Sequence, residues 1–224
     1  MELTEKTLEV LKNYASINSN IVFNEGSVIK TVSEAKNVLS TSTLDVSFPK
    51  QFGIYDLNEF LSTLSLLDSP TMKFEDKCVI VSDGVGRSRI KYFYSDIDML
   101  TSPEKDIIMP ECEVTFNLAR DTLLKIKRAA SVLGHTEVSL SNDGGRLSLS
   151  VIDNNDKTSN VFSIDVDGNC GDVPFNFIFN ISNLKMIDGD YTVGISAKLI
   201  SHFQNNTSGI EYWVALEKNS VYGA

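Results

Sequence analysis

Residues 122–131 read TLLKIKRAAS and residues 7–16 read TLEVLKNYAS, with five of the ten positions identical. Two further pairs of segments are similar in the same order: YDLNEFL at 55–61 with FNISNLK at 179–185, and IKYFY at 90–94 with IEYWV at 210–214. The offsets between the paired segments are 115, 124 and 120 residues. Collinear matches at a nearly constant offset are typical of a duplicated unit. The sequence therefore predicts two similar halves.

Each half repeats the order helix, strands, helix, strands. Thr4 is the expected N-cap of the first helix, and apolar residues recur at helical spacing after it, at Leu8, Leu11 and Ala15. The counterpart helix in the second half places four apolar residues on one face: Leu123, Ile126, Ala130 and Leu133. A second, shorter helix is expected at 56–67 in the first half and at 181–186 in the second.

Alternating and β-branched segments around turn residues predict antiparallel hairpins. One hairpin is expected from IVF at 21–23 and SVIKTV at 27–32, around an NEG turn. Another is expected from EVSLS at 137–141 and RLSLSV at 146–151, around an NDGG turn. The sequence thus predicts an α+β fold with antiparallel sheets in both halves.

The segment between the halves, residues 95–111, contains two prolines and mixed charge, which is typical of an extended connector. Its apolar side chains are too many for a fully solvated linker, so we expect it to pack along the surface. The predicted organisation is a domain at 1–94, a connector at 95–111 and a second domain at 112–224.

Composition narrows the class of protein. The chain of 224 residues is 42% hydrophobic and 22% charged, which is ordinary for a globular protein. No apolar run approaches the roughly 18 residues that cross a bilayer, and the start, MELTEKTLEV, lacks the pattern of a signal peptide. We therefore expect a cytosolic protein without membrane contact. Cys78, Cys112 and Cys170 form no CxxC pair and indicate neither disulfides nor zinc.

Catalytic signatures are missing from the sequence. The two histidines, His135 and His202, have no motif around them, and there is no nucleophile elbow, zinc-protease motif or complete phosphate-binding loop. No catalytic residue, metal ligand or cofactor is predicted.

Positive charge gathers on one predicted helix, although the formal net charge of the chain is −10. Residues 118–133 contain four basic side chains and one acidic one, and the basic ones cover the side opposite the apolar face: Arg120, Lys125, Lys127 and Arg128. The equivalent helix of the first half turns Lys6 and Lys12 outward, with Lys12 at the position of Lys127. A solvated polar face is the ordinary explanation of such a pattern, and a surface for a polyanion is the other.

The sequence resembles the sliding clamps of tailed bacteriophages, which are processivity factors of phage DNA polymerases. The likeness covers nearly the whole chain and rests on LKNYASINS at 11–19, IYDLNEFLSTLSLL at 54–67, FNFIFNISNLKM at 175–186 and YWVALE at 212–217. It implies the clamp fold: two similar domains, each with two helices packed on antiparallel sheets. It also implies a homotrimer that closes into a ring of six domains, with the helices lining the hole.

The resemblance gives the basic helices a role. It places Lys6, Lys12, Arg120, Lys125, Lys127 and Arg128 toward duplex DNA, held topologically and without sequence preference, while an acidic exterior discourages adhesion elsewhere. It implies a DNA polymerase and an ATP-driven clamp loader as partners, in the cytoplasm of the infected bacterial host. Partner tails would enter an apolar pocket near the connector, for which the candidates are Tyr92, Leu100, Ile107, Ile108 and Met109. These side chains are equally expected if they only hold the connector down.

Two features of the sequence depart from this resemblance, and two alternative functions stay open. Glu9 stands outward where the second half has Leu124, and the helix at 56–67 has no basic residue, so the positive field of the hole is patchy. The alternative functions are a small acidic hydrolase with a site assembled from scattered residues, and a protein-interaction module that never touches DNA.

Overall fold

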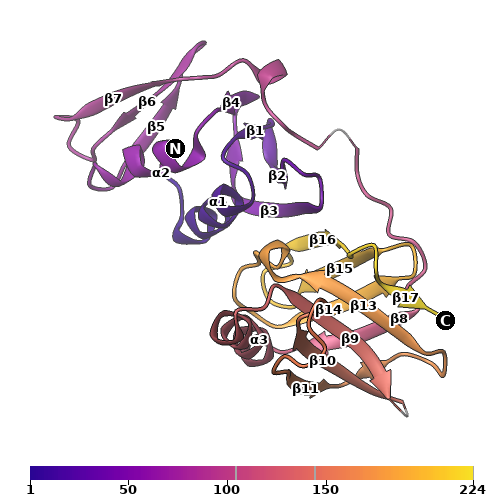
Figure 1. Ribbon diagram of the computed structural model, residues 1–224. Coiled ribbons are helices and arrows are strands. Elements are labelled where there is room, and N and C mark those ends of the chain that lie inside the picture. Colours follow the sequence, from indigo (N-terminus) through magenta and orange to yellow (C-terminus); the bar gives the residue numbers. More distant parts are fainter. Residues whose placement is uncertain (104, 144, 224) are drawn as a thin grey trace. The chain divides into compact units, whose positions relative to one another are not determined.

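The computed structural model describes residues 1–103, 105–143 and 145–223 (Figure 1). Three positions of predicted features lie outside the described residues: Glu104 in the connector, Gly144 in the NDGG turn, and Ala224 at the end of the second domain. The chain divides into unit 1, Met1–Asp106, and unit 2, Ile107–Ala224. The boundary between the two units falls within residues 95–111 of the chain. That this segment connects a domain at 1–94 with a domain at 112–224 stays a prediction.

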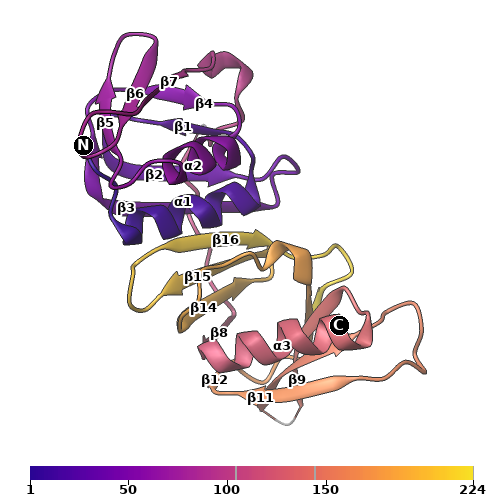
Figure 2. The ribbon, with the colours of Figure 1, turned by 90° about the vertical axis from the view of Figure 1, so that its left-hand side faces the viewer.

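Unit 1 contains two α-helices, a 3-10 turn and short antiparallel strands. Its elements are α1 (Glu5–Ile17), β1 (Ile21–Phe23), β2 (Gly26–Val32), β3 (Val38–Phe48), β4 (Phe52–Ile54), α2 (Leu57–Ser65), β5 (Thr71–Phe74), β6 (Cys78–Ser82), β7 (Arg89–Phe93) and η1 (Ile97–Met99). β5, β6 and β7 form one sheet in that order, β2 pairs with β3, and β1 pairs with β4. α1 and α2 lie side by side (Figure 2).

Unit 2 contains one α-helix, a 3-10 turn and two antiparallel sheets. Its elements are β8 (Val114–Leu118), α3 (Arg120–Leu133), β9 (Glu137–Asp143), β10 (Arg146–Ile152), β11 (Phe162–Val166), β12 (Gly168–Asn169), β13 (Phe175–Asn180), η2 (Ile181–Asn183), β14 (Tyr191–Ser196), β15 (Ile200–Asn205), β16 (Glu211–Ala215) and β17 (Val221–Tyr222). One sheet has the order β11-β10-β9-β13-β17, and the other contains β12-β8-β14-β15-β16. α3 packs across β10 and β11 of the first (Figure 2).

Side-chain chemistry explains where α1 begins and why it stays in place. The Thr4 hydroxyl accepts a hydrogen bond from the Thr7 backbone N–H at 3.1 Å, which confirms the predicted N-cap. Both threonine hydroxyls donate to Asp45 Oδ1 on β3 at 2.7 Å, and these bonds, the one from Thr7 first, lower the pKa of Asp45. Leu11 and Tyr14 are fully buried beneath the helix. The apolar stripe and the cap therefore fix the same face of α1 against the sheet.

The hairpin predicted from 21–23 and 27–32 is wrong. β1 pairs with β4, which places Phe23 opposite Phe52, while β2 turns away at Gly26, with φ 103°, to pair with β3. The rings of Phe23 and Phe52 stack with centroids 4.5 Å apart. The burial and stacking of this aromatic pair favour β4 over the nearer segment as the partner of β1.

The short helix predicted at 181–186 is confirmed only for its first three residues, where the 3-10 helix η2 forms. The Asn180 side chain accepts from the Ser182 N–H and starts the turn, but Leu184 leaves the helical region with ψ 46°. Leu184 and Met186 are nevertheless buried. The hairpin predicted around NDGG is confirmed, since β9 pairs with β10 and Leu140 lies opposite Leu149.

One edge of the unit 1 sheet is covered by the first residues of the chain. The Met1 amine donates to the Met72 carbonyl at 2.9 Å, and the Met72 N–H donates to the Met1 carbonyl at 2.7 Å. This reciprocal pair continues the sheet beyond β5. The opposite edge of the same sheet is β7.

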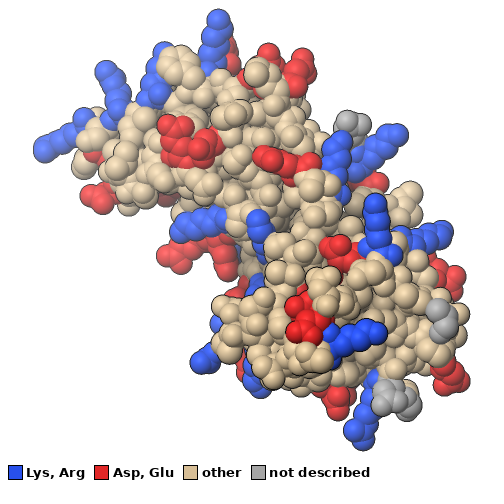
Figure 3. All heavy atoms as spheres, viewed as in Figure 1, with Lys and Arg blue, Asp and Glu red and all other residues tan. Residues whose placement is uncertain are grey.

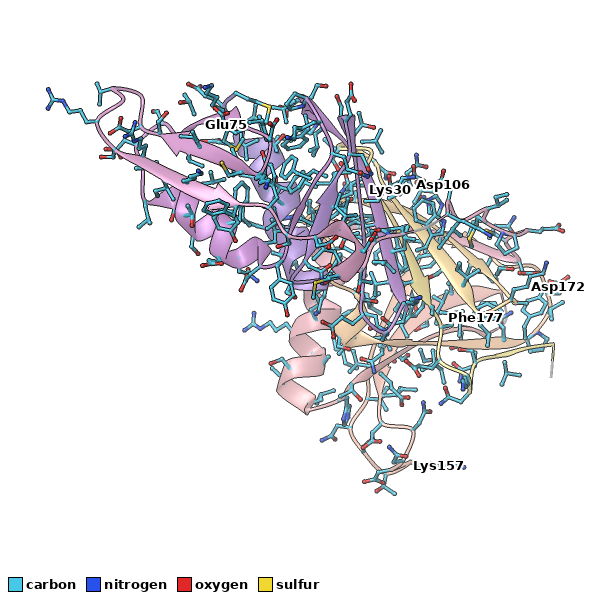
Figure 4. All side chains as sticks on the ribbon, turned by 90° about the horizontal axis from the view of Figure 1, so that it is seen from above. Lys30, Glu75, Asp106, Lys157, Asp172 and Phe177 are labelled. Atoms are coloured by element: carbon cyan, nitrogen blue, oxygen red, sulfur yellow. The ribbon has the colours of Figure 1, made fainter. Side chains whose placement is uncertain are left out.

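The first part of the connector is fixed to unit 1. The Ser95 N–H donates to the Gly53 carbonyl, and the Thr101 N–H donates to the Asn20 side chain. Further along, Lys30 on β2 forms an ion pair with Asp106 (Figure 4). The expectation that the segment packs along the surface holds for this stretch.

Candidate functional site

α3 carries the four basic residues that the sequence indicated. Its two ends are capped in different ways. Ala119 stands at the N-cap without a capping side chain, and the Arg120 N–H instead donates to Asp190 Oδ1 at 2.8 Å. A carboxylate at this position satisfies a free N–H and complements the helix dipole. The other end closes at Gly134, whose φ of 72° lies in the left-handed region. The helix thus depends on a distant acidic loop.

Arg120 is neutralised by that same loop. Its Nη2 lies 2.9 Å from Asp188 Oδ2, and this hydrogen bond is the main reason why the pKa of Arg120 is raised. Both side chains are 53% exposed, so the pair is accessible to solvent. The charge of Arg120 is therefore partly compensated by Asp188.

The other three basic residues of α3 differ in exposure. Lys127 is half-buried, and burial lowers its pKa although Asp188 acts in the opposite sense. Lys125 and Arg128 are exposed, and no ion pair involves either of them within the described residues. The charge expected on this helix is present, and Lys125 and Arg128 carry its most available part.

Lys6 and Lys12 are both exposed on α1. Lys12 also borders an apolar hollow of about 210 Å³, lined by Leu3, Leu8, Leu61, Leu64, Ser65, Leu67, Pro70 and Met72. Sequence reasoning did not foresee this hollow between the two helices. Figure 3 shows that Lys and Arg are interspersed with Asp and Glu on the face drawn.

Tyr92, a candidate for the partner pocket, lies on β7 beneath α2. Its ring meets that of Phe60 edge-on, with centroids 5.2 Å apart. Its hydroxyl donates to Glu59 Oε2 at 3.1 Å, and burial followed by this carboxylate raises the pKa of Tyr92. Tyr92 thus joins α2 to the outermost strand of its sheet.

The remaining pocket candidates are spread along the connector. Leu100 is half-buried in unit 1, where its Cδ1 lies 2.5 Å from the place that a Cβ on Gly53 would occupy. Ile107, Ile108 and Met109 belong to unit 2, and Ile108 is 91% exposed. Tyr92 and Leu100 lie in unit 1, whereas the other three candidates lie in unit 2. None of the five candidates lines the hollow beside Lys12 or the hollow between α3 and β11.

A second open hollow, of about 540 Å³, lies between α3 and the start of β11. We call it the α3 groove, and it is lined by Lys125, Arg128, Ala129, Val132, Leu133, Val161 and Phe162. Val132 is 76% exposed and Val161 is 57% exposed. The floor of the α3 groove is apolar and its rim is basic. Such a surface is suited to binding another macromolecule.

Groups for general acid–base or metal chemistry do not converge in the described residues. His135 Nε2 is bound to the Asn160 carbonyl, and His202 lies 2.6 Å from Glu211 and stacks on Trp213. No cluster of three metal-ligating side chains occurs in the part of the chain that the structure describes. In those ranges, no helix is long and apolar enough to cross a membrane.

Comparison with known proteins identifies the fold and the family. A family model described as "DNA polymerase processivity factor" matches residues 4–92, and one described as "gp45 sliding clamp, C terminal" matches residues 115–218. The sliding clamp of Vibrio phage KVP40 is 33% identical over 222 residues, which cover 97% of this chain and 99% of the relative. The chain belongs to the phage sliding-clamp family.

Other sliding clamps are similar over the same length. Those of Escherichia phage RB69 and Enterobacteria phage T4 are 26% and 27% identical, each over 99% of both chains. Proliferating cellular nuclear antigen from Entamoeba histolytica has a TM-score of 0.67 at 13% identity, covering 94% of each chain. The PCNA2–PCNA3 complex of Sulfolobus tokodaii gives 0.68 at 12%, covering 94% of this chain and 95% of that one. The α+β sliding-clamp fold expected from the sequence is confirmed.

Family membership removes one of the alternatives. Sliding clamps are processivity factors and not enzymes, so the hydrolase is excluded.

Proposed function

We infer that three copies of this sliding clamp close into a ring around duplex DNA. The match along 97% of the chain to a phage sliding clamp carries the proposal, together with the division of the chain into two compact units. Two units per copy require three copies for a ring of six. An interface between unlike surfaces of successive copies generates such a closed ring if its rotation returns to the start.

The basic side chains of α1 and α3 face the DNA in this ring. Lys6, Lys12, Arg120, Lys125, Lys127 and Arg128 supply the positive charge, and the net charge of −10 means that the remaining surface is acidic. Phosphate contacts of this kind are sequence-independent and weaken with salt. Because Asp188 holds Arg120 and Lys127 is half-buried, the contacts are weak enough for sliding, and retention comes from closure.

The loaded ring tethers the replicative DNA polymerase. A tethered polymerase re-engages the primer end at high effective concentration after each release. An ATP-driven loader opens the ring, and the process takes place in the cytoplasm of the infected bacterial host. The tails of these partners bind an apolar surface for which Tyr92, Leu100, Ile107, Ile108 and Met109 were the sequence candidates.

Retention on circular DNA tests the ring. The protein is loaded onto a nicked circle with its loader, exposed to high salt, and the DNA is then either cut or left intact before gel filtration. We expect the protein to stay with the intact circle and to leave the cut one. Equal release from both would mean that charge alone holds it.

The same experiment bears on the interaction module that never touches DNA. Such a module would not associate with either form of the circle, even with loader and ATP present. Light scattering of the free protein adds the mass of the assembly, and a stable monomer at all concentrations would contradict the trimer.

A further inference from the structure

One face of the sheet formed by β5, β6 and β7 is basic, although the chain as a whole is acidic. The other face of this sheet packs under α2, where Tyr92 meets Phe60. Side chains alternate along a strand, so the residues between the packed ones point away from α2. No acidic residue occurs on these three strands, all of which the structure describes. We call the surface that points away from α2 the outer basic face, and it consists of Lys73, Ile80, Arg89, Lys91 and Phe93.

The register of the strands places cations around an apolar centre. Ile80 lies opposite Lys73 on β5 and opposite Lys91 on β7. Because neighbouring strands are about 4.8 Å apart, the two lysines flank Ile80 at about 10 Å from each other across the sheet. Arg89 and Phe93 each lie two residues from Lys91, about 7 Å along β7 on either side. Phe93 is 62% exposed, so apolar surface and positive charge are both accessible on this face.

Glu75 shows which kind of anion the outer basic face holds. It stands in the turn between β5 and β6 (Figure 4). Lys73 Nζ lies 2.7 Å from Glu75 Oε1, and this hydrogen bond is the main reason why the pKa of Glu75 is lowered. Lys91 and Lys50 act in the same sense. A single side-chain carboxylate is thus stabilised by three lysines.

The remaining positive charge is not balanced locally. Within the described residues, neither Arg89 nor Lys91 forms an ion pair. Asp83 is the nearest acidic residue before β7, and its carboxylate accepts the backbone N–H groups of Arg87 at 2.9 Å and Ser88 at 3.0 Å. It therefore closes the turn between β6 and β7, and the exposed Arg87 adds to the charge at that end. Figure 3 shows Lys and Arg side chains projecting from the part of unit 1 that holds this sheet.

We propose that the outer basic face binds an acidic, extended segment of a partner protein. Carboxylates of the segment meet Arg89 and Lys91, and its apolar side chains cover Ile80 and Phe93. Each residue of an extended chain advances about 3.3 Å, so a few residues are enough to cross three strands. The proposal goes beyond the ring and its DNA contacts, because it concerns other residues, all of them within unit 1.

Charge complementarity and the state of Phe93 favour a protein segment over nucleic acid. A single-stranded nucleic acid binds such a surface by stacking a base on an aromatic ring between cations. Here the ammonium of Lys91 lies over the ring of Phe93, 5.0 Å from its centroid. A base must displace this contact, whereas a carboxylate can pair with the ammonium where it stands. The contact between Lys73 and Glu75 is of the same kind.

Fluorescence anisotropy with a labelled synthetic peptide tests the proposal. The peptide consists of Asp and Glu residues around a central pair of leucines, and its controls are the same peptide with Asn and Gln in place of the acids, and an oligothymidylate of equal length. We expect the acidic peptide to bind, with an affinity that falls as salt rises, and both controls to bind at least tenfold more weakly. Tighter binding of the oligothymidylate, lost in Lys91→Gln, would assign the face to nucleic acid and overturn the proposal.

Substitution of single cations tests where the peptide binds. Arg89→Gln and Lys91→Gln should each weaken binding by up to about fivefold, as for exposed ion pairs, whereas Lys91→Arg should keep it. Lys6→Gln is the matched control, because it removes the same charge from α1 of the same unit, and it should leave the affinity unchanged. Equal loss with Lys6→Gln would mean that the peptide responds to net charge alone. Unchanged binding by the double variant of Arg89 and Lys91 would refute the site.

Glu75→Gln tests the competition between the internal carboxylate and the peptide. Loss of the Glu75 charge frees Lys73 and increases the positive field at Lys91, so the acidic peptide should bind up to about fivefold more tightly. An affinity that stays the same or falls would contradict the placement of the carboxylates of the peptide on this face.

A cycle of substitutions tests the apolar contact. Phe93→Ser and replacement of the two leucines of the peptide by serine should each weaken binding. The two changes together should weaken it little more than either one alone, because they remove the same contact. Fully additive losses would refute contact between Phe93 and the leucines.

Retention on circular DNA separates this proposal from the ring. The double variant Arg89→Gln with Lys91→Gln should lose the peptide and remain on the intact circle. Loss of retention in this variant would mean that these cations serve the ring or its DNA, which contradicts the proposal. If the unaltered protein binds the peptide but is not retained on the circle, the ring fails and the outer basic face stands.

Discussion

Asp188→Asn is expected to strengthen the contact between this sliding clamp and duplex DNA. In the structure Asp188 lies 2.9 Å from the Arg120 guanidinium and also acts on Lys127. Loss of its charge leaves Arg120 free to meet a phosphate. The cost in folding stability is small, since both side chains of the pair are 53% exposed and such pairs contribute about 0.2–1 kcal/mol.

The gain in DNA affinity follows from counterion release. One additional phosphate contact steepens the slope of log K against log salt by about 0.9, which amounts to roughly eightfold in affinity at about 0.1 M salt. Because each copy contributes one Arg120, the effect per ring can exceed this value.

Fluorescence anisotropy with a short labelled duplex measures this contact separately from topological retention. A salt series compares the unaltered protein with Asp188→Asn, Arg120→Ala and the double variant. We expect a steeper slope for Asp188→Asn, little change for Arg120→Ala, and a return to the original slope in the double variant. An unchanged slope for Asp188→Asn would refute the reasoning, and a gain that persists in the double variant would exclude Arg120 as the contact.

Three further predictions concern the elements that position these helices. Asp190→Ala should destabilise the protein by about 1 kcal/mol in thermal scans, because α3 loses its cap. Asp190→Asn should destabilise it less. Equal stability of both variants and the unaltered protein would contradict the capping role. Asp45→Asn should lower the urea midpoint at neutral pH. This difference should begin to shrink as pH falls below about 4, the ordinary carboxyl pKa, and should be lost once pH has fallen through the lowered pKa of Asp45; a difference that persists in stronger acid would contradict the assignment. Phe60→Ala, which empties a site only 1% exposed under Tyr92, should cost about 3–5 kcal/mol in urea unfolding, and a loss below about 1 kcal/mol would show that β7 does not depend on it.

Local sequence patterns were sufficient for some elements. Apolar residues at helical spacing predicted two helices: Leu8, Leu11 and Ala15 predicted α1, and Leu123, Ile126 and Ala130 predicted α3. Such a prediction is possible because helical periodicity depends only on residues close together in the sequence. The hairpin β9–β10 was predicted for the same reason, as its turn and both strands are contiguous. The duplication was predicted by comparison of the chain with itself, and it stays a prediction.

Contacts between distant residues explain what the patterns missed. β1 was assigned to the nearest strand, whereas the stacking of Phe23 on Phe52 selects β4. The basic residues of α3 were named as DNA-facing candidates, and that role stays a prediction. The ion pair between Arg120 and Asp188 could not be predicted, because it joins residues 68 positions apart. One signal was available: Ala119 cannot cap a helix, so a distant acceptor such as Asp190 was to be expected.

The reciprocal pairing of Met1 with Met72 limits how copies of this chain can grow into larger structures. Met1 already pairs with β5 at one edge of the three-stranded sheet of unit 1. Within the described residues, β7 is the other edge of this sheet and is unpaired on its outer side. A further strand can therefore pair with this sheet along β7, but not at Met72, whose N–H and C=O are already used.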